Sequence, residues 1–232
     1  MANFYKKAQF GRSMVEMLGV LAIIGMLSLG SIAAYSAAMF KYQLNQHAES
    51  FGLLLNNAIT LLPELRRNYG IGLPDGDNAN ISKLFADTSL LPAGMHYNPR
   101  QRVITDVFKN TFRIGYPHRI NTNNGFDSSE YFISIDISRD KNKISSRAKA
   151  ICRNILAVAK ENADSIWAVE MESYFPNGSY SASTFVGGRY SFRNKTKRLV
   201  DANLTDFEKT CSACDSERRC ILAFWIDVTY NN

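Results

Sequence analysis

Near its start the chain has one long apolar run. From Met17 to Phe40 the sequence contains no charged side chain. As a helix, at about 1.5 Å of rise per residue, this run spans roughly 36 Å, enough to cross a bilayer core of roughly 30 Å. No second run of this kind follows in the sequence. The pattern therefore predicts one membrane-spanning or filament-core segment followed by a soluble remainder.

The apolar run passes without a break into an amphipathic pattern. After Lys41, apolar residues recur at spacings of three and four, which is typical of one helix face. We therefore predict a single helix from about Ser13 to Leu62, which Pro63 ends or kinks because proline lacks a backbone N–H. The Gly, Pro, Asp and Asn content of residues 68–80 predicts a loop. The predicted apolar face comprises Leu44, Ala48, Phe51, Leu55, Ile59 and Leu62.

Beyond residue 100 the pattern changes to the two-residue period of β-strands. Two strand-like runs, 102–108 and 111–117, flank a short turn and predict a hairpin. A third run, 131–138, alternates regularly, and further strands are predicted at 165–171 and 220–228. The predicted core residues on these strands are Tyr131, Ile133, Ile135, Ile137, Trp167 and Trp225.

Helical patterns accompany the strands. A short helix is predicted from about Ile81 to Phe85, and a longer one over 144–162, which Ser145 or Ser146 can cap. Residues 175–198, rich in Gly, Ser and aromatic residues, predict a surface loop or an edge hairpin. The order indicates an α+β fold, with a long N-terminal helix and a C-terminal head of antiparallel sheet plus helix. The apolar stripe of the longer helix is Ile151, Ile155, Leu156 and Ala159.

Composition and charge narrow the function only slightly. Apolar residues make up 46% of the 232 residues, as in ordinary folded proteins, and the formal net charge is +6. One basic cluster is either a solvated surface or a contact for an anionic partner such as DNA or a membrane surface. We find no nucleophile–base set, phosphate loop or metal-ligand spacing, so neither catalysis nor a cofactor is predicted. The cluster comprises Arg193, Lys195, Lys197 and Arg198.

The four cysteines all follow the apolar run, and three lie close together near the C-terminal end. In an exported domain an even number of cysteines predicts disulfides, and four cysteines allow three pairings. The alternatives are a zinc site or a redox motif, because two of the cysteines form a Cys-x-x-Cys pair. The cysteines are Cys152, Cys211, Cys214 and Cys220.

A single carboxylate interrupts the apolar character of the N-terminal segment. Glu16 lies five residues after Gly11, at the edge of the uncharged run, and a lone charge in hydrocarbon is costly and usually functional. Lys6 and Lys7 make the preceding residues basic, which favours their retention on the cytoplasmic side. A secretory signal peptide cleaved within residues 28–38 is an alternative, although such apolar regions rarely carry an acid.

These residues, GRSMVEMLGVLAIIG at positions 11–25, resemble the processing site of type IV prepilins. That family has a short basic leader ending in glycine, a cut by the prepilin peptidase, a glutamate at the fifth mature position and a long apolar run. The resemblance places the cut between Gly11 and Arg12 and makes Glu16 the fifth mature residue. Arg12 departs from the family pattern, in which the first mature residue is usually apolar and N-methylated.

The resemblance also implies a partner for Glu16. Once the leader is cut, the new α-amino group of Arg12 on a neighbouring subunit can pair with it. The pair is useful mainly because an unpaired charge in an apolar filament core is so unfavourable. It would fix the axial register between subunits. The alternative is that Glu16 lies at the membrane surface without a partner.

The C-terminal part resembles the head of type IVb pilins. The segments LLPAGM, TDFEKTC and ILAFWID follow the order of that group, with a cysteine-bearing helix between the first two. In that group the helix cysteine is bridged to a cysteine just before the last strand. The resemblance thus implies a bridge between Cys152 and Cys211 and a small loop closed by Cys214 and Cys220. From the residues alone, Cys152 can instead reach Cys214 or Cys220.

The resemblance divides the chain into a prepilin leader at 1–11, a transmembrane or filament-core segment at 12–40, an amphipathic half-helix at 41–69 and a pilin head at 70–232. It implies a structural subunit of a type IV pilus-like filament that serves adhesion, motility or aggregation. Before assembly the subunit would cross the bacterial inner membrane once, with its head in the periplasm. Its implied partners are copies of itself, other pilins, the prepilin peptidase and an inner-membrane assembly platform.

Two other functions share part of this pattern. A pseudopilin of a type II secretion system has the same N-terminal motif. A single-span membrane-anchored binding domain or enzyme needs only the apolar run, and in it Glu16 would be incidental. A filament subunit should need Glu16 to assemble, whereas an anchored domain should work without it.

Overall fold

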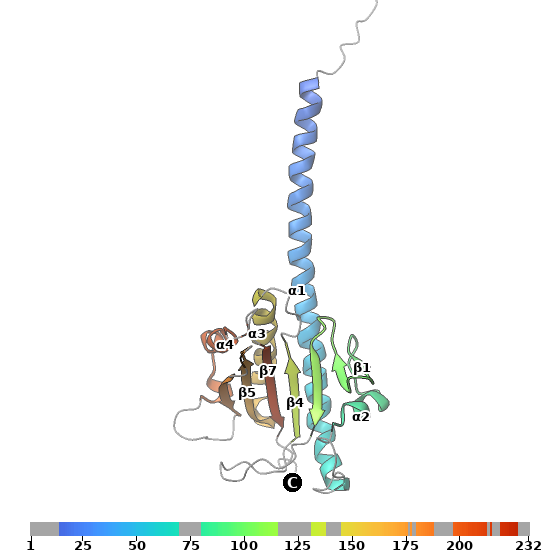
Figure 1. Cartoon of the computed structure of the whole chain (residues 1–232), viewed down its shortest axis with the longest axis vertical. Coiled ribbons are helices and arrows are strands. Elements are labelled where there is room, and N and C mark those ends of the chain that lie inside the picture. The colour runs from blue at the N-terminus through green and yellow to red at the C-terminus, as the bar shows by residue number, and fades with distance from the viewer. Residues whose placement is uncertain are drawn as a thin grey trace, which may run out of the picture. The chain divides into compact units, whose positions relative to one another are not determined.

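The computed structural model of the chain describes residues 14–69, 80–115, 131–137, 145–175, 177, 180–187, 197–212, 214 and 219–226. The chain divides into two compact units, Met1–Gln43 and Leu44–Asn232. The first helix, α1 (Met14–Tyr69), contributes residues to both units, and the whole sheet belongs to the second (Figure 1). The α+β class predicted from the sequence is confirmed, and the arrangement is consistent with a pilin-like fold.

The predicted long helix is present, and of the two effects predicted for Pro63, an end or a kink, the end does not occur. α1 continues through Pro63 and ends at Tyr69, while residues 70–79 of the predicted loop lie outside the described residues. A proline inside a helix removes one backbone hydrogen bond and crowds the preceding turn. The helix persists here because Ala58 and Leu62 in that turn are fully buried, so tertiary packing outweighs the local cost.

The buried face of α1 is centred slightly away from the predicted one. Of the six predicted positions, Leu44, Ala48 and Ile59 are only partly buried, and the other three are fully buried. Four residues that the apolar spacing did not indicate complete the stripe, and one of them is the polar His47. Among the α1 residues whose burial the structure describes, the buried set is His47, Phe51, Leu54, Leu55, Ala58, Leu62 and Pro63.

A seven-stranded antiparallel sheet has the order β1-β2-β3-β4-β7-β5-β6. The last strand in the sequence, β7, is inserted between β4 and β5 and joins the two halves of the sheet. The hairpin β2–β3 is as predicted. Residues 175–198, predicted as a surface loop or an edge hairpin, contain the edge strand β6, which pairs with β5. The strands are β1 (His96–Asn98), β2 (Val103–Thr105), β3 (Thr111–Gly115), β4 (Tyr131–Asp136), β5 (Ile166–Tyr174), β6 (Tyr180–Val186) and β7 (Arg219–Ile226).

The two faces of the sheet differ in character. One face packs against α1, where Phe51 meets Phe224 of β7 with ring centroids 5.1 Å apart, and α3 (Ser145–Glu161) lies on the same face (Figure 1). The alternating residues predicted for β4 all point into this core. On the opposite face, called the outer face below, Trp225 is only half-buried and lies against Phe132 at 5.5 Å. The prediction of Trp225 as a core residue is therefore wrong, whereas Trp167 is buried.

The shorter helices complete the second unit. α2 (Ser82–Asp87) and α3 match the predicted helices, and the predicted stripe of α3 is buried. The side chains of its two possible capping serines lie outside the described residues. The helix α4 (Leu204–Cys211) was not predicted, although Asn203 and Asp206 form a capping box at its start, in which each side chain accepts the other's backbone N–H.

A buried polar contact ties α1 to the turn between β2 and β3. The Nε2 atom of His47 lies 2.9 Å from Oδ2 of Asp106, and both side chains are almost fully buried. The Asp106 carboxylate also accepts the backbone N–H groups of Phe108 and Asn110, at 2.9 and 2.8 Å, and the Asn110 side-chain amide at 2.7 Å. One carboxylate thus satisfies several buried donors, which fixes the turn against the helix.

The substitution Asp106→Ala is expected to lower the free energy of unfolding by about 3 kcal/mol, because it leaves buried donors without an acceptor. Urea titration of the detergent-solubilised full chain, followed by tryptophan fluorescence, measures the change. The matched control is Asp87→Ala, which removes an exposed carboxylate paired with Lys83 and should have no measurable effect. Equal effects of the two substitutions would contradict this assignment.

Candidate functional site

The N-terminal part of α1 exposes apolar side chains all round its surface. From Met14 to Met39 the exposed fractions of the large apolar residues run from 38% to 85%. Within the described part of the chain, this helix is the one long and apolar enough to cross a membrane. A helix that is apolar on every side is stable only when lipid or other protein surrounds it. This segment therefore requires a partner, whether bilayer or neighbouring helices.

The polar groups of this segment are few and mostly satisfied within it. The hydroxyls of Ser28, Ser31 and Ser36 donate to the carbonyls of Ile24, Leu27 and Ala33, at distances of 2.7 to 2.9 Å. Their donors thus need no partner outside the helix when water is absent.

Glu16 is the one charged side chain of residues 14–40. It is exposed in the first turn of α1, where a carboxylate is favoured by the helix dipole, and no described residue forms an ion pair with it. If the region around Glu16 were buried away from water, its carboxylate would need a cation as a partner. The predicted processing residues Gly11 and Arg12 lie outside the described residues.

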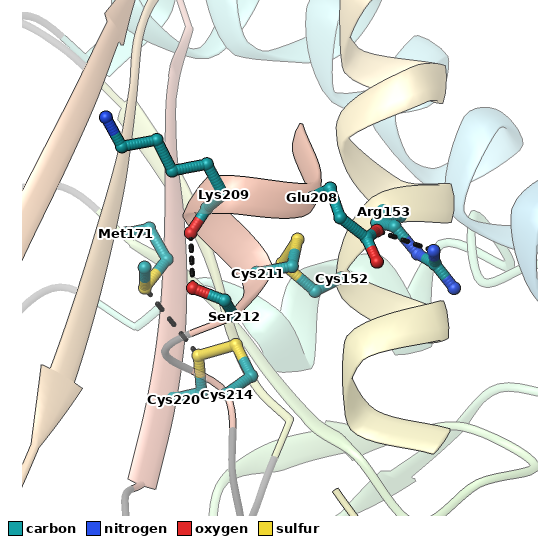
Figure 2. Close-up of a disulfide and its surroundings, with 9 residues drawn as sticks. All are labelled: Cys152, Arg153, Met171, Glu208, Lys209, Cys211, Ser212, Cys214 and Cys220. Carbon is teal, nitrogen blue, oxygen red and sulfur yellow. Dashed lines mark hydrogen bonds and ion pairs between the residues drawn. A yellow bond between two sulfur atoms is a disulfide. The ribbon is translucent and has the colours of Figure 1, made fainter. Parts of the chain in front are cut away.

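The cysteines form two disulfides, Cys152–Cys211 and Cys214–Cys220. The first joins α3 to α4 with Cα atoms 5.8 Å apart, and the second joins the chain just after α4 to the start of β7 (Figure 2). This is the pairing that the resemblance implied among the three possible ones. The zinc and free-dithiol alternatives are wrong, because no cysteine remains free to provide a thiolate.

Other contacts hold α4 beside the rest of the fold. Arg153 of α3 and Glu208 of α4 form an ion pair next to the first disulfide, and Figure 2 shows both pointing toward each other. The ammonium group of Lys160 donates to the carbonyl of Ala202 at 2.6 Å. The second disulfide contacts the Met171 sulfur at 3.6 Å from Cys220 Sγ. α4 is therefore attached to both α3 and the sheet.

The basic cluster is partly neutralised by carboxylates. Lys197 pairs with Asp206, and Arg198 donates to Asp201 through Nε at 2.7 Å. The hydrogen bond from the Asn203 backbone and the Lys197 ammonium lower the pKa of Asp206, and the Arg198 guanidinium lowers that of Asp201. The other members, Arg193 and Lys195, lie outside the described residues. DNA binding by the cluster stays a prediction.

Comparisons with known proteins identify no relative. No family model matches the chain, no curated protein matches its sequence, and no solved structure matches its fold. The assignment of function therefore depends on the residues and geometry described above.

The two disulfides are expected to contribute unequally to stability. Cys152 and Cys211 are 59 positions apart, and Cys214 and Cys220 are 6 apart. In the chain-entropy model the longer loop corresponds to about 4 kcal/mol and the shorter to about 2 kcal/mol. Replacing both cysteines of the first pair by alanine should thus lower the urea midpoint more than replacing both of the second. The reverse order would show that the long-range bridge is not the main constraint.

Proposed function

We propose that this chain is a structural subunit of a type IV pilus-like filament, cut after Gly11 and assembled through its N-terminal helix. The observation that carries the proposal is the helix segment from Met14 to Phe40, which exposes apolar side chains on all sides and carries one carboxylate, Glu16. At about 1.5 Å per residue this segment is about 40 Å long, which suits one bilayer span before assembly. The same surface can later be covered by copies of the helix.

The position of Glu16 supports filament packing over simple anchoring. An anchor needs no charge in its apolar segment, and a charge there carries a cost. In a bundle of such helices the carboxylate becomes tolerable when a cation faces it. The α-amino group created at Arg12 of a neighbouring subunit is that cation in our proposal. Assembly would then depend on prior cutting, because the amine does not exist in the precursor.

The second compact unit is suited to the exposed part of a filament. It has its own core, which includes the C-terminal part of α1, and its cysteines are fully bridged. Disulfides persist in oxidising surroundings, such as the periplasm and the cell exterior. In our proposal the subunit therefore crosses the inner membrane once, with this unit in the periplasm, and becomes extracellular after assembly.

Cutting after Gly11 is expected to require a small residue at that position. In cells that contain a prepilin peptidase, the full chain should mature to a shorter band on a denaturing gel, and Gly11→Leu should remain at precursor size. Gly19→Leu is the matched control, because Gly19 lies beyond the predicted cut and no atom comes within 4 Å of a Cβ placed there. A mature band from Gly11→Leu would refute this cleavage site.

Loss of the Glu16 carboxylate is expected to abolish filaments without removing the subunit from the membrane. Glu16→Ala should reduce sheared surface filaments at least tenfold, with an unchanged amount of mature subunit in the membrane fraction. Glu49→Ala is the control, because Glu49 is an exposed carboxylate of the same helix outside the apolar segment. Normal filaments from Glu16→Ala would favour an anchored domain, in which that carboxylate has no function. If the wild-type chain is present in the membrane but forms no surface filament, this result would favour a pseudopilin.

A further inference from the structure

A cavity of about 370 Å³ lies on the outer face of the sheet, in the second compact unit. Its volume falls within the range of small-molecule sites. It is bounded by the segment before α2, the turn between β1 and β2, and the strands β3 and β4. Two guanidinium groups, two carboxamides, one hydroxyl and one aromatic ring line it, and none belongs to the proposed assembly helix. These residues are Asn80, Gln101, Arg102, Arg113, Phe132 and Ser134.

Hydrogen bonds fix the rim of this cavity. The Asn80 side chain donates to the Arg102 carbonyl at 2.6 Å and accepts the backbone N–H of Ser82 at 3.0 Å. The Ser82 hydroxyl in turn accepts the backbone N–H of Ile114 at 3.0 Å. One carboxamide and one hydroxyl thus join the β1–β2 turn, the start of α2 and β3. A rim that is already ordered loses little entropy when a ligand binds.

The backbone at Arg102 is strained. Its φ is +54°, in the left-handed region that side-chain-bearing residues rarely adopt. Such strain persists only where the surroundings enforce it, and it concentrates at functional sites. Here the bond from Asn80 to the Arg102 carbonyl holds the turn in place. Arg102 thus borders the cavity in a strained backbone conformation.

The cavity carries positive charge. Arg113 projects from β3 on the outer face, opposite Ser134 of β4, and is exposed. No carboxylate among the described residues forms an ion pair with Arg113. Arg102, in the facing turn, also lines the cavity and has an interaction of its own within the chain. A single guanidinium group such as that of Arg113 can bind a planar carboxylate by two parallel hydrogen bonds, which a lysine cannot provide.

The aromatic ring in the cavity provides a flat apolar surface. Phe132 is held from the side by Trp225, with ring centroids 5.5 Å apart. Its partner on β3 is Gly115, which also borders the cavity and has no side chain to cover the ring. A ligand here therefore meets a fixed ring beside the Arg113 guanidinium.

We propose that this cavity binds an acidic sugar residue of a glycan. The carboxylate would be held by the Arg113 guanidinium, and the C–H face of the sugar ring would rest on Phe132. The Gln101 amide and the Ser134 hydroxyl, which also line the cavity, would meet the sugar hydroxyls. A bare inorganic anion would use the cation but leave the ring and these polar groups unused. Ligand binding at this site does not depend on filament assembly, because the site lies wholly in the second unit.

Saturation-transfer NMR on the detergent-solubilised full chain tests the ligand class. The matched probes are methyl glucuronide and methyl glucoside, which differ in a carboxylate, with N-acetylneuraminic acid as a second sugar acid. At least one acid should bind, and its affinity should exceed that of the glucoside at least tenfold. The proposal is overturned if the glucoside binds as tightly as the acids. It is also overturned if neither acid binds at 20 mM, a concentration of about the order at which very weak complexes form. Displacement of the acid by an equal concentration of inorganic phosphate would also overturn it, because the site would then be a plain anion site.

Substitutions test the location of the site. Arg113→Gln should weaken binding of the sugar acid at least tenfold, and Arg113→Lys should restore only part of it. Arg100→Gln is the control, because Arg100 is an exposed arginine of the same β1–β2 turn that does not line the cavity. Circular dichroism should show the same fold for all three variants. Equal losses for Arg113→Gln and Arg100→Gln would indicate diffuse charge attraction and contradict a defined site.

Discussion

The packing of α1 against the sheet is the interaction on which the folded unit depends. Phe51, Leu54 and Leu55 are fully buried, and each such side chain contributes about 1.5 to 3 kcal/mol when removed from water. The rings of Phe51, Phe112 and Phe224 connect the helix to strands on both sides of β4. Because β7 is the last strand, this core is complete only when the end of the chain has joined its centre. The two disulfides then hold α4 and β7 in place.

The same helix changes character along its length. Its C-terminal part buries one face within the second unit, while its N-terminal part has no buried apolar face at all. The C-terminal part of α1 thus belongs to a folded core, whereas its N-terminal part exposes an apolar surface that is unfavourable in water. In the filament that we propose, this change of character separates the two tasks of the subunit. One part of α1 supports the exposed unit, and the other packs with copies of itself.

Much of the fold could be predicted because its signals are local and periodic. The alternation from Tyr131 to Ile137 and the stripe of α3 each reflect burial of one face, and both predictions are confirmed. The predictions failed where tertiary packing outweighs local preference. Pro63 stays within α1, Trp225 lies on the outer face, and the buried His47 is explained only by its contact with Asp106. A short helix such as α4 was missed because its capping box is its main local signal.

The candidate sites differ in how far the sequence reveals them. Glu16 stands out because it is the single charge in an apolar run, and the cysteines stand out by type, so sequence reasoning reaches both. The outer cavity combines residues from four separate segments, and no local pattern joins Asn80, Arg102 and Arg113. The pairing of β2 with β3, the hydrogen bond from Asn80 to Arg102 and the bond from Ile114 to Ser82 bring them together. A spatial site of this kind requires the fold before it can be recognised.

The most direct measurement for the central claim is a helical reconstruction, by electron cryo-microscopy, of filaments formed by this chain. Our account predicts that the chain begins at Arg12 and that the α-amino group of one subunit lies within about 4 Å of the Glu16 carboxylate of a neighbour. The N-terminal segments of α1 should pack together in the filament core. A filament in which Glu16 faces solvent, or in which residues 1–11 are still attached, would contradict the account.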